Sequence, residues 1–132
     1  VTSLSMIAMV VFSIAIMAID ADHTSSSTDS IIATCSSHAI PSGSAFWGNL
    51  GTLISMLTQE TPYTEGYSYK TRTGGGNAPA MGEASCVATC SPWECEACLR
   101  ARANDLYRIC NGLLGGRVQA QTCMIHYECT NF

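Results

Sequence analysis

Eight cysteines in a chain of 132 residues are the feature that most restricts what this sequence can fold into. An even number of cysteines in a short chain is typical of disulfide-bonded domains from an oxidising compartment. A chain of this length buries only about two-thirds of its unfolded surface, so its core alone gives modest stability. Each native bridge adds roughly 2–4 kcal/mol. We therefore expect one small domain held by disulfides with no free thiol, although cysteine spacing alone does not select the pairing.

Two other uses of the cysteines compete with this interpretation. The C-x2-C pair at Cys95 and Cys98 resembles half of a zinc site, but His23, His38 and His126 stand apart and provide no second half. A redox-active C-x2-C needs its first cysteine at a helix N-terminus, where free amides favour the thiolate. The helix start described below places Cys95 past those amides. We therefore favour structural disulfides, and we expect no metal and no cofactor.

The N-terminal part of the chain carries an uncharged apolar run over residues 5–19. This run is shorter than the roughly 20 residues that a transmembrane helix needs. We interpret residues 1–21 as a signal peptide that lacks its first residues, with a buried core helix as the alternative. Residues 22–29 are polar and are predicted to form a flexible start of the mature chain. The expectation is a secreted, extracellular protein that does not insert into a membrane.

The charge of the chain argues against a nucleic-acid partner. Charged residues make up 12% of the sequence and the net charge is −4. The basic residues form no run, being scattered at Lys70, Arg72, Arg100, Arg102, Arg108 and Arg117. Nucleic acid and anionic membranes are bound through clustered positive charge. Neither is an expected partner.

Apolar spacing predicts an α+β domain with an antiparallel sheet. Residues 31–35 are short and β-branched, which favours a strand. From Phe46 to Gln59 the apolar residues recur on one helix face, and Pro62 prevents further extension. Residues 67–72 alternate as a half-buried strand does, and a glycine-rich turn follows over residues 73–79.

The second helix has the clearest start signal in the chain. Ser91, Pro92 and Glu94 form a capping-box pattern with proline at the first helical position. Apolar residues then recur at steps of three and four until Cys110, and Gly112 is a typical stop. Beyond residues 115–116 the chain alternates again, which predicts closing strands.

The spacing C-x8-C-x2-C at Cys86, Cys95 and Cys98 resembles the signature of the ginkbilobin-homologous domain. That domain occurs in secreted antifungal proteins, plasmodesmata-located proteins and ectodomains of cysteine-rich receptor-like kinases. The likeness covers residues 30–132. It includes IPSGS (40–44), GYSYKT (66–71), GGGNAP (74–79), ICN (109–111), GGRVQ (115–119) and IHYECTNF (125–132).

The resemblance implies two helices packed on a five-stranded antiparallel sheet, stapled by disulfides. It implies three bridges, Cys35–Cys110, Cys86–Cys95 and Cys98–Cys123. Cys90 and Cys129 match no cysteine of this pattern, so a fourth bridge between them is an open question.

The resemblance also implies a mannose site made of an Asn, an Arg and a Glu. These positions correspond to Ser36, Arg117 and Glu128, so the Asn is replaced. His126, Trp47 and Trp93 are interpreted as surface or core residues rather than ligands.

The expected function is that of a secreted plant defence protein. It would act in the apoplast, as a monomer, on mannose or mannan-type glycans of the fungal cell wall. The alternative is an apoplastic or seed interaction protein, or a storage-like one, that keeps the fold without the sugar site. We expect no enzyme, because pairing the cysteines leaves no nucleophile with a base, and nothing in the sequence brings Glu83 and Glu128 together.

Overall fold

The computed structural model describes residues 30–129. The interpretation of residues 1–21 as a signal peptide and of residues 22–29 as a flexible start concerns residues outside this range. The elements in chain order are β1 (Ile32–Cys35), α2 (Phe46–Glu60), β2 (Ser68–Thr73), β3 (Ala80–Cys86), α3 (Pro92–Ile109), β4 (Gly115–Gln119) and β5 (Cys123–Glu128). Two short 3-10 turns, Thr61–Tyr63 and Glu65–Tyr67, connect α2 to β2.

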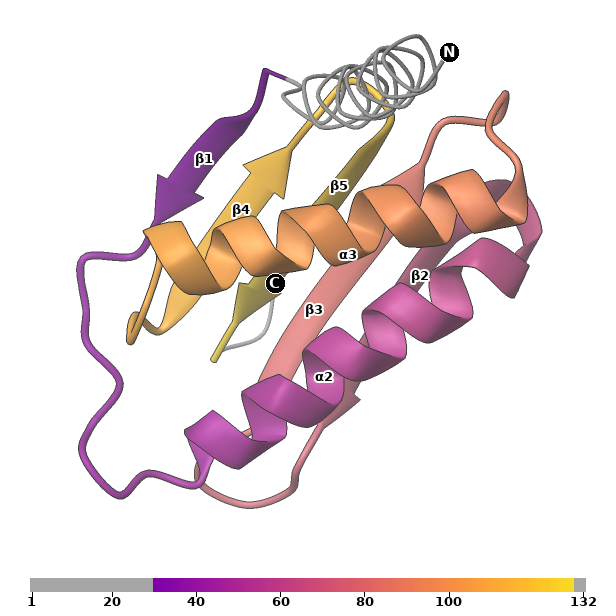
Figure 1. The fold of residues 1–132 in the computed structure, drawn as a ribbon. Coiled ribbons are helices and arrows are strands. Elements are labelled where there is room, and N and C mark those ends of the chain that lie inside the picture. The colour runs from indigo at the N-terminus through magenta and orange to yellow at the C-terminus, as the bar shows by residue number, and fades with distance from the viewer. Residues whose placement is uncertain (1–29, 130–132) are drawn as a thin grey trace, which may run out of the picture. The chain divides into compact units, whose positions relative to one another are not determined.

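The strands form one antiparallel sheet in the order β1-β4-β5-β3-β2. Both helices lie on the same face of this sheet (Figure 1). No helix within residues 30–129 covers the opposite face, and none is long and apolar enough to cross a bilayer. The predicted fold class, two helices on a five-stranded antiparallel sheet with disulfides, is confirmed.

Both helices form where the sequence predicts them. In α3 the Ser91 hydroxyl accepts from the Glu94 amide at 3.2 Å, and the Glu94 carboxylate accepts from the Ser91 amide at 3.3 Å. These bonds satisfy N–H groups that have no partner inside the helix. Gly112, with φ of +74°, turns the chain after α3. Helix α2 gives way to the 3-10 turn that contains Pro62.

Strand β3 is the element that apolar spacing does not reveal. Its helix-facing positions carry only small side chains, at Ala80, Gly82, Ala84 and Cys86. A Cβ atom on Gly82 would lie 2.8 Å from Leu57 Cδ1 and 2.9 Å from Leu53 Cδ2. The leucines of α2 therefore pack directly on the strand backbone. A strand without large apolar residues shows no clear alternation, so only the resemblance implied a fifth strand.

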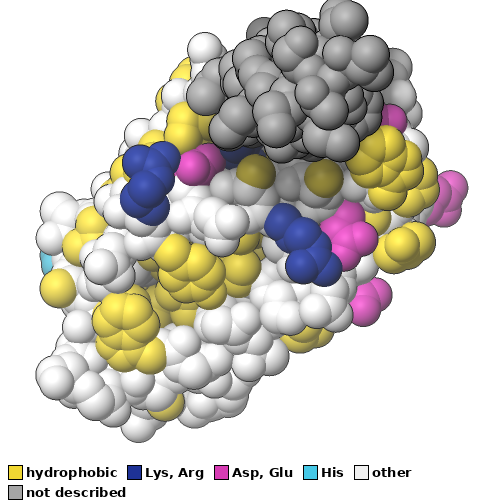
Figure 2. All heavy atoms as spheres, in the orientation of Figure 1, with side chains coloured by type: hydrophobic (Ala, Val, Ile, Leu, Met, Phe, Trp, Pro, Cys, Tyr) yellow, Lys and Arg dark blue, Asp and Glu magenta, His cyan; other side chains and the backbone are white. Residues whose placement is uncertain are grey.

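The core lies between the helices and the sheet. Its largest fully buried apolar side chains are Phe46, Leu53, Leu57, Leu99, Leu106, Val118 and Ile125. Figure 2 shows the helix-covered side, where hydrophobic side chains reach the surface between the helices. The expectation that Trp47 and Trp93 pack in the core is wrong, because they are 44% and 72% exposed. Both lie in the first turn of their helices, Trp47 in α2 and Trp93 in α3, and both project into solvent.

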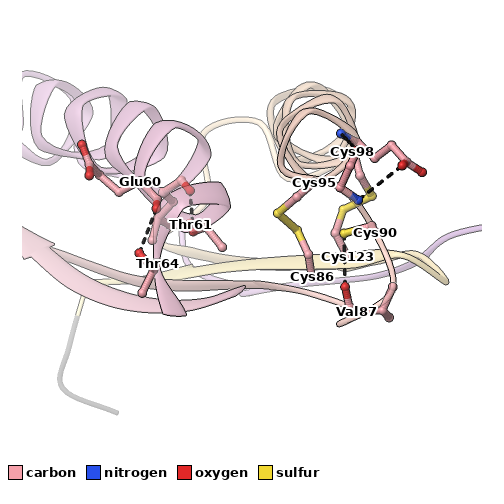
Figure 3. The surroundings of a disulfide bond; sticks show 12 residues. Glu60, Thr61, Thr64, Cys86, Val87, Cys90, Cys95, Cys98 and Cys123 are labelled. Carbon is pink, nitrogen blue, oxygen red and sulfur yellow. Dashed lines mark hydrogen bonds between the residues drawn. A yellow bond between two sulfur atoms is a disulfide. The ribbon is translucent and has the colours of Figure 1, made fainter. Parts of the chain in front are cut away.

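Three disulfides join α3 and the residue after it to the sheet: Cys35–Cys110, Cys86–Cys95 and Cys98–Cys123. They are the pairs that the resemblance implied. The first connects edge strand β1 to the C-terminal end of α3, and the other two connect the first turns of α3 to β3 and β5. Figure 3 shows the latter two running from α3 down to the strands.

Cys90 and Cys129 are free thiols, so the expectation of full pairing is wrong, and the open question of a fourth bridge is answered by its absence. Cys90 lies in the loop after β3, at the end of the sheet where Cys86 pairs with Cys123. Cys129 follows Glu128 at the other end of β5. At about 3.3 Å per residue the two ends of β5 lie roughly 20 Å apart. A disulfide tolerates at most about 7 Å between Cα atoms.

Candidate functional site

The face of the sheet without helices carries a row of polar side chains across all five strands. Strand register places them side by side in the order Thr34, Arg117, His126, Glu83 and Lys70. Basic and acidic groups therefore neighbour each other along this row.

A hollow of about 300 Å³ opens at the corner of this face, over β1, β4 and β5. We call it the first hollow. Its lining residues are Thr34, Cys35, Ser36, Gly115, Gly116, Arg117, His126 and Glu128. Ser36, Arg117 and Glu128, the predicted sugar-binding residues, are thus brought together although they lie up to 92 positions apart (128 − 36).

Backbone pairing positions each of these three residues. Ser36 follows β1, and its amide donates to the Gly115 carbonyl at 2.9 Å. Arg117 sits in β4 opposite Thr34, and its guanidinium donates to Gln119 at 3.1 Å. Glu128 ends β5 directly opposite Gly115. The pairing of β1, β4 and β5 therefore fixes the spacing of the hydroxyl, the guanidinium and the carboxylate.

Gly115 keeps the floor of the first hollow open. A Cβ atom at this position would lie 3.5 Å from Ser36 Cβ and 3.7 Å from Glu128 Cγ. These are ordinary van der Waals distances, so a side chain would fit, but it would fill the space between the two polar residues. The absence of a side chain leaves that space to a ligand.

His126 is the residue of this site that sequence reasoning missed, because it was interpreted as a surface residue. Its Nε2 lies 3.2 Å from a Glu128 carboxylate oxygen and its Nδ1 lies 3.3 Å from a Glu83 oxygen. The imidazole is only 16% exposed. His126 therefore holds Glu128 at the hollow and connects it to Glu83, two carboxylates that the sequence alone did not bring together.

Tyr127 supports the site from the core side. Its hydroxyl donates to the Leu113 carbonyl at 2.7 Å, in the turn that leads into β4. Burial raises the pKa of Tyr127 to about 12, with a further contribution from Tyr107. The hydroxyl consequently keeps its proton and its hydrogen bond at any physiological pH. This hydrogen bond holds the turn before β4, the strand that contains Gly115 and Arg117.

The set of groups in the first hollow suits a polyhydroxylated ligand. The guanidinium of Arg117 donates in a planar fork, the carboxylate of Glu128 accepts, and the hydroxyl of Ser36 does both. Neighbouring hydroxyls of a sugar ring require donors and acceptors close together. The arrangement can therefore bind a sugar diol by direct hydrogen bonds.

Comparison with known proteins places the chain in a family. Residues 34–130 match the family model described as "Salt stress response/antifungal". The antifungal protein ginkbilobin-like protein of Picea abies is 40% identical over 107 residues, which are 80% of this chain and 97% of the relative. Antifungal protein ginkbilobin-2 of Ginkgo biloba is 42% identical over 104 residues, 77% of each chain.

A solved structure has the same fold. The tandem DUF26 ectodomain of the cysteine-rich receptor-like protein PDLP5 from Arabidopsis thaliana superposes with a TM-score of 0.71 at 22% identity. The match covers 80% of this chain and 52% of that ectodomain, so the chain spans about half of the tandem protein. The matched residues 34–130 contain β2 to β5, the last two residues of β1, the three bridges and the first hollow. The chain belongs to the salt stress response/antifungal family.

Proposed function

We propose that this protein is a secreted antifungal defence protein that binds mannose-containing glycans of the fungal cell wall. Ser36, Arg117 and Glu128 would bind the sugar, and the protein would act as a monomer in the apoplast. The observation that carries the proposal is the convergence of these three groups in one solvent-open hollow. The similarity to antifungal proteins of Picea abies and Ginkgo biloba supports the defence role.

The expected affinity follows from the kinds of bond available. A neutral hydrogen bond contributes about 0.5–1.5 kcal/mol net, and one to a charged group about 1.5–3 kcal/mol. Arg117 and Glu128 therefore supply most of the binding free energy, and the Ser36 hydroxyl supplies less. The open hollow leaves much of the ligand in water. A single mannose is expected to bind weakly.

The second candidate function is an interaction protein that has lost the sugar site, and Ser36 is the observation that favours it. The Ser36 hydroxyl accepts from the His38 amide at 3.1 Å, so part of its acceptor capacity is already used. The Asn expected from the family carries a longer side chain with two amide donors and a carbonyl acceptor. Replacing it by serine shortens the reach toward a sugar and removes a donor.

Ser36→Asn is expected to strengthen mannose binding by about five- to thirty-fold, which corresponds to about 1–2 kcal/mol, the scale of one good hydrogen bond. The added amide reaches the same hydroxyls that Arg117 and Glu128 bind. Titration calorimetry with mannose, on the wild-type and variant proteins, measures the gain. In the Ser36→Asn background, Arg117→Ala is expected to abolish it.

Arg72→Ala is the matched control, since Arg72 is an exposed arginine on β2, at the far edge of the sheet from β1. It is expected to leave mannose binding unchanged. If Ser36→Asn binds mannose no better than the wild type, the sugar site is not at this hollow. The interaction-protein function then becomes the better proposal.

A further inference from the structure

A second hollow adjoins the first. It has a volume of about 190 Å³ and is lined by Ser36, His38, Leu114, Gly115, Glu128 and Cys129. Ser36, Gly115 and Glu128 line both hollows. The two are therefore neighbouring parts of one depression, separated by the strip that these three residues form.

Because Gly115 has no side chain, the strip between the two hollows leaves room for a ligand. A side chain at this position would stand between Ser36 and Glu128, at 3.5 and 3.7 Å from their nearest carbons, and so between the hollows. Without one, the Ser36 hydroxyl and the Glu128 carboxylate border both spaces. A ligand that extends from one hollow into the other would pass between these two polar groups.

The second hollow offers a different mixture of groups from the first. Leu114 supplies a half-buried apolar wall, whereas His38 is exposed and supplies an imidazole. A pyranose ring has the matching asymmetry, with an apolar C–H face and a rim of hydroxyls. The first hollow alone is at the lower end of the size of small-molecule pockets, about 300 Å³. The second hollow adds room for one more ring.

We propose that the two hollows are subsites for adjacent hexose units of one oligosaccharide, with Ser36 and Glu128 at the linkage. The inference rests on the proposed function and sharpens its ligand from mannose to a linked mannose oligosaccharide. Two rings share one loss of translational freedom on binding, so the second ring adds affinity at little entropic cost. The site accordingly selects the glycan polymer over the free sugar.

Titration calorimetry of the oxidised full chain with mannose and with α-linked mannobiose tests this proposal. Mannobiose is expected to bind at least about tenfold more tightly than mannose, a difference of about 1.4 kcal/mol. His38→Ala is expected to remove this preference and to leave mannose affinity unchanged. Gly115→Ala is expected to weaken mannobiose binding by about tenfold or more, whereas Gly51→Ala, an exposed glycine of α2 with nothing near its Cβ position, serves as the control.

The outcomes separate the two proposals. Equal affinities for mannose and mannobiose in the wild type would overturn the second subsite and leave the proposed function standing. Binding of neither sugar would overturn both. A tenfold preference that survives in His38→Ala would also overturn the assignment of the second hollow, because the second ring then lies elsewhere. Melting temperatures of the variants establish that each one is folded.

An independent observation concerns the free thiol of Cys90. The sulfurs of Cys86, Cys90 and Cys95 all lie within 4.8 Å of one another, and all three residues are buried (Figure 3). Cys86 and Cys95 form a disulfide, and the Cys90 thiol donates to the Val87 carbonyl at 3.1 Å. Cys90 thus sits inside the short loop that the Cys86–Cys95 bridge closes. A nucleophilic group is held beside a bond that it can attack.

We infer that Cys90 exchanges with the Cys86–Cys95 bridge. The Cys90 thiolate attacks one bridge sulfur, a new S–S bond forms to Cys90 as the old one breaks, and the departing sulfur takes up the proton. One disulfide and one thiol are present before and after, so the step needs no oxidant or reductant. The free thiol is therefore distributed over the three cysteines rather than confined to Cys90.

Peptide mapping of a single-thiol variant tests the exchange. Cys129→Ser protein is incubated at mildly alkaline pH, where thiols ionise, and is then acidified, denatured and labelled with N-ethylmaleimide in acid to stop further exchange. The label is expected on Cys86 or Cys95 as well as on Cys90. Label on Cys90 alone would overturn the inference. The Cys90→Ser, Cys129→Ser protein is the control and is expected to take up no label.

Discussion

Replacing Cys35 and Cys110 together by serine is expected to lower the free energy of unfolding by about 4 kcal/mol. This bridge spans 75 residues, against 9 for Cys86–Cys95 and 25 for Cys98–Cys123. In the chain-entropy account, a longer closed loop restricts the unfolded chain more. The bridge also secures β1, an edge strand that pairs with β4 alone. Its loss therefore affects both the unfolded and the folded chain.

Urea unfolding under oxidising conditions measures this effect. The double serine variant of Cys86 and Cys95 is the matched comparison, and its short loop gives an expected loss of about 2.5 kcal/mol. A domain of this size is stable by about 5–15 kcal/mol in total, so the first variant loses a large share. Equal losses for the two variants would contradict the loop-length explanation.

Gly82→Ala is expected to destabilise the fold by about 1–3 kcal/mol through overpacking. The new methyl group would lie 2.8 Å from the His126 carbonyl oxygen and from Leu57 Cδ1. A backbone oxygen in a paired strand cannot move away as a flexible side chain can, so β3 and β5 must separate locally while Leu53 and Leu57 of α2 also give way. Denaturant unfolding of the variant gives the cost.

Gly51→Ala, the same change on the exposed side of α2, is the matched control. Nothing lies within 4 Å of its Cβ position, and alanine favours the helix over glycine by up to about 1 kcal/mol. The two substitutions should therefore have opposite signs. A Gly82→Ala protein as stable as the wild type would show that α2 does not rest on the bare strand.

The success of the fold predictions followed from local signals. The capping box at Ser91 and Glu94 acts within four residues, so the start of α3 can be recognised without knowing what surrounds it. Strand β3 depends instead on its neighbours. Gly82 is small because Leu53 and Leu57 occupy the space of its side chain, and those leucines lie in another element. A strand that must have small residues under a neighbouring helix shows no periodic apolar pattern of its own.

The site was harder to predict from the sequence because its residues also depend on their neighbours in other elements. Ser36, Arg117 and Glu128 come from the end of one strand and from two others, and only the resemblance pointed to them together. Alternation placed His126 and Glu128 on one face of β5, but the contact with Glu83 depends on the register between β3 and β5. The unpaired state of Cys90 and Cys129 likewise depends on the fold, because the loop after β3 holds Cys90 near one end of β5 while Cys129 follows the other end. No local sequence pattern shows the register between strands or the distance between the two cysteines.

The position of Ser36 directly after Cys35 links the lining of the first hollow to the redox state of the Cys35–Cys110 pair. Cys35 is bonded to Cys110, and Ser36 reaches Gly115 only from the strand end that this bond secures. In a reducing cytosol the bond is absent, and the residue that completes the hollow loses its tether. We therefore expect the lining of the hollow to be complete only in the oxidised protein, so that the redox state of one disulfide controls both the attachment of β1 and the geometry of the hollow.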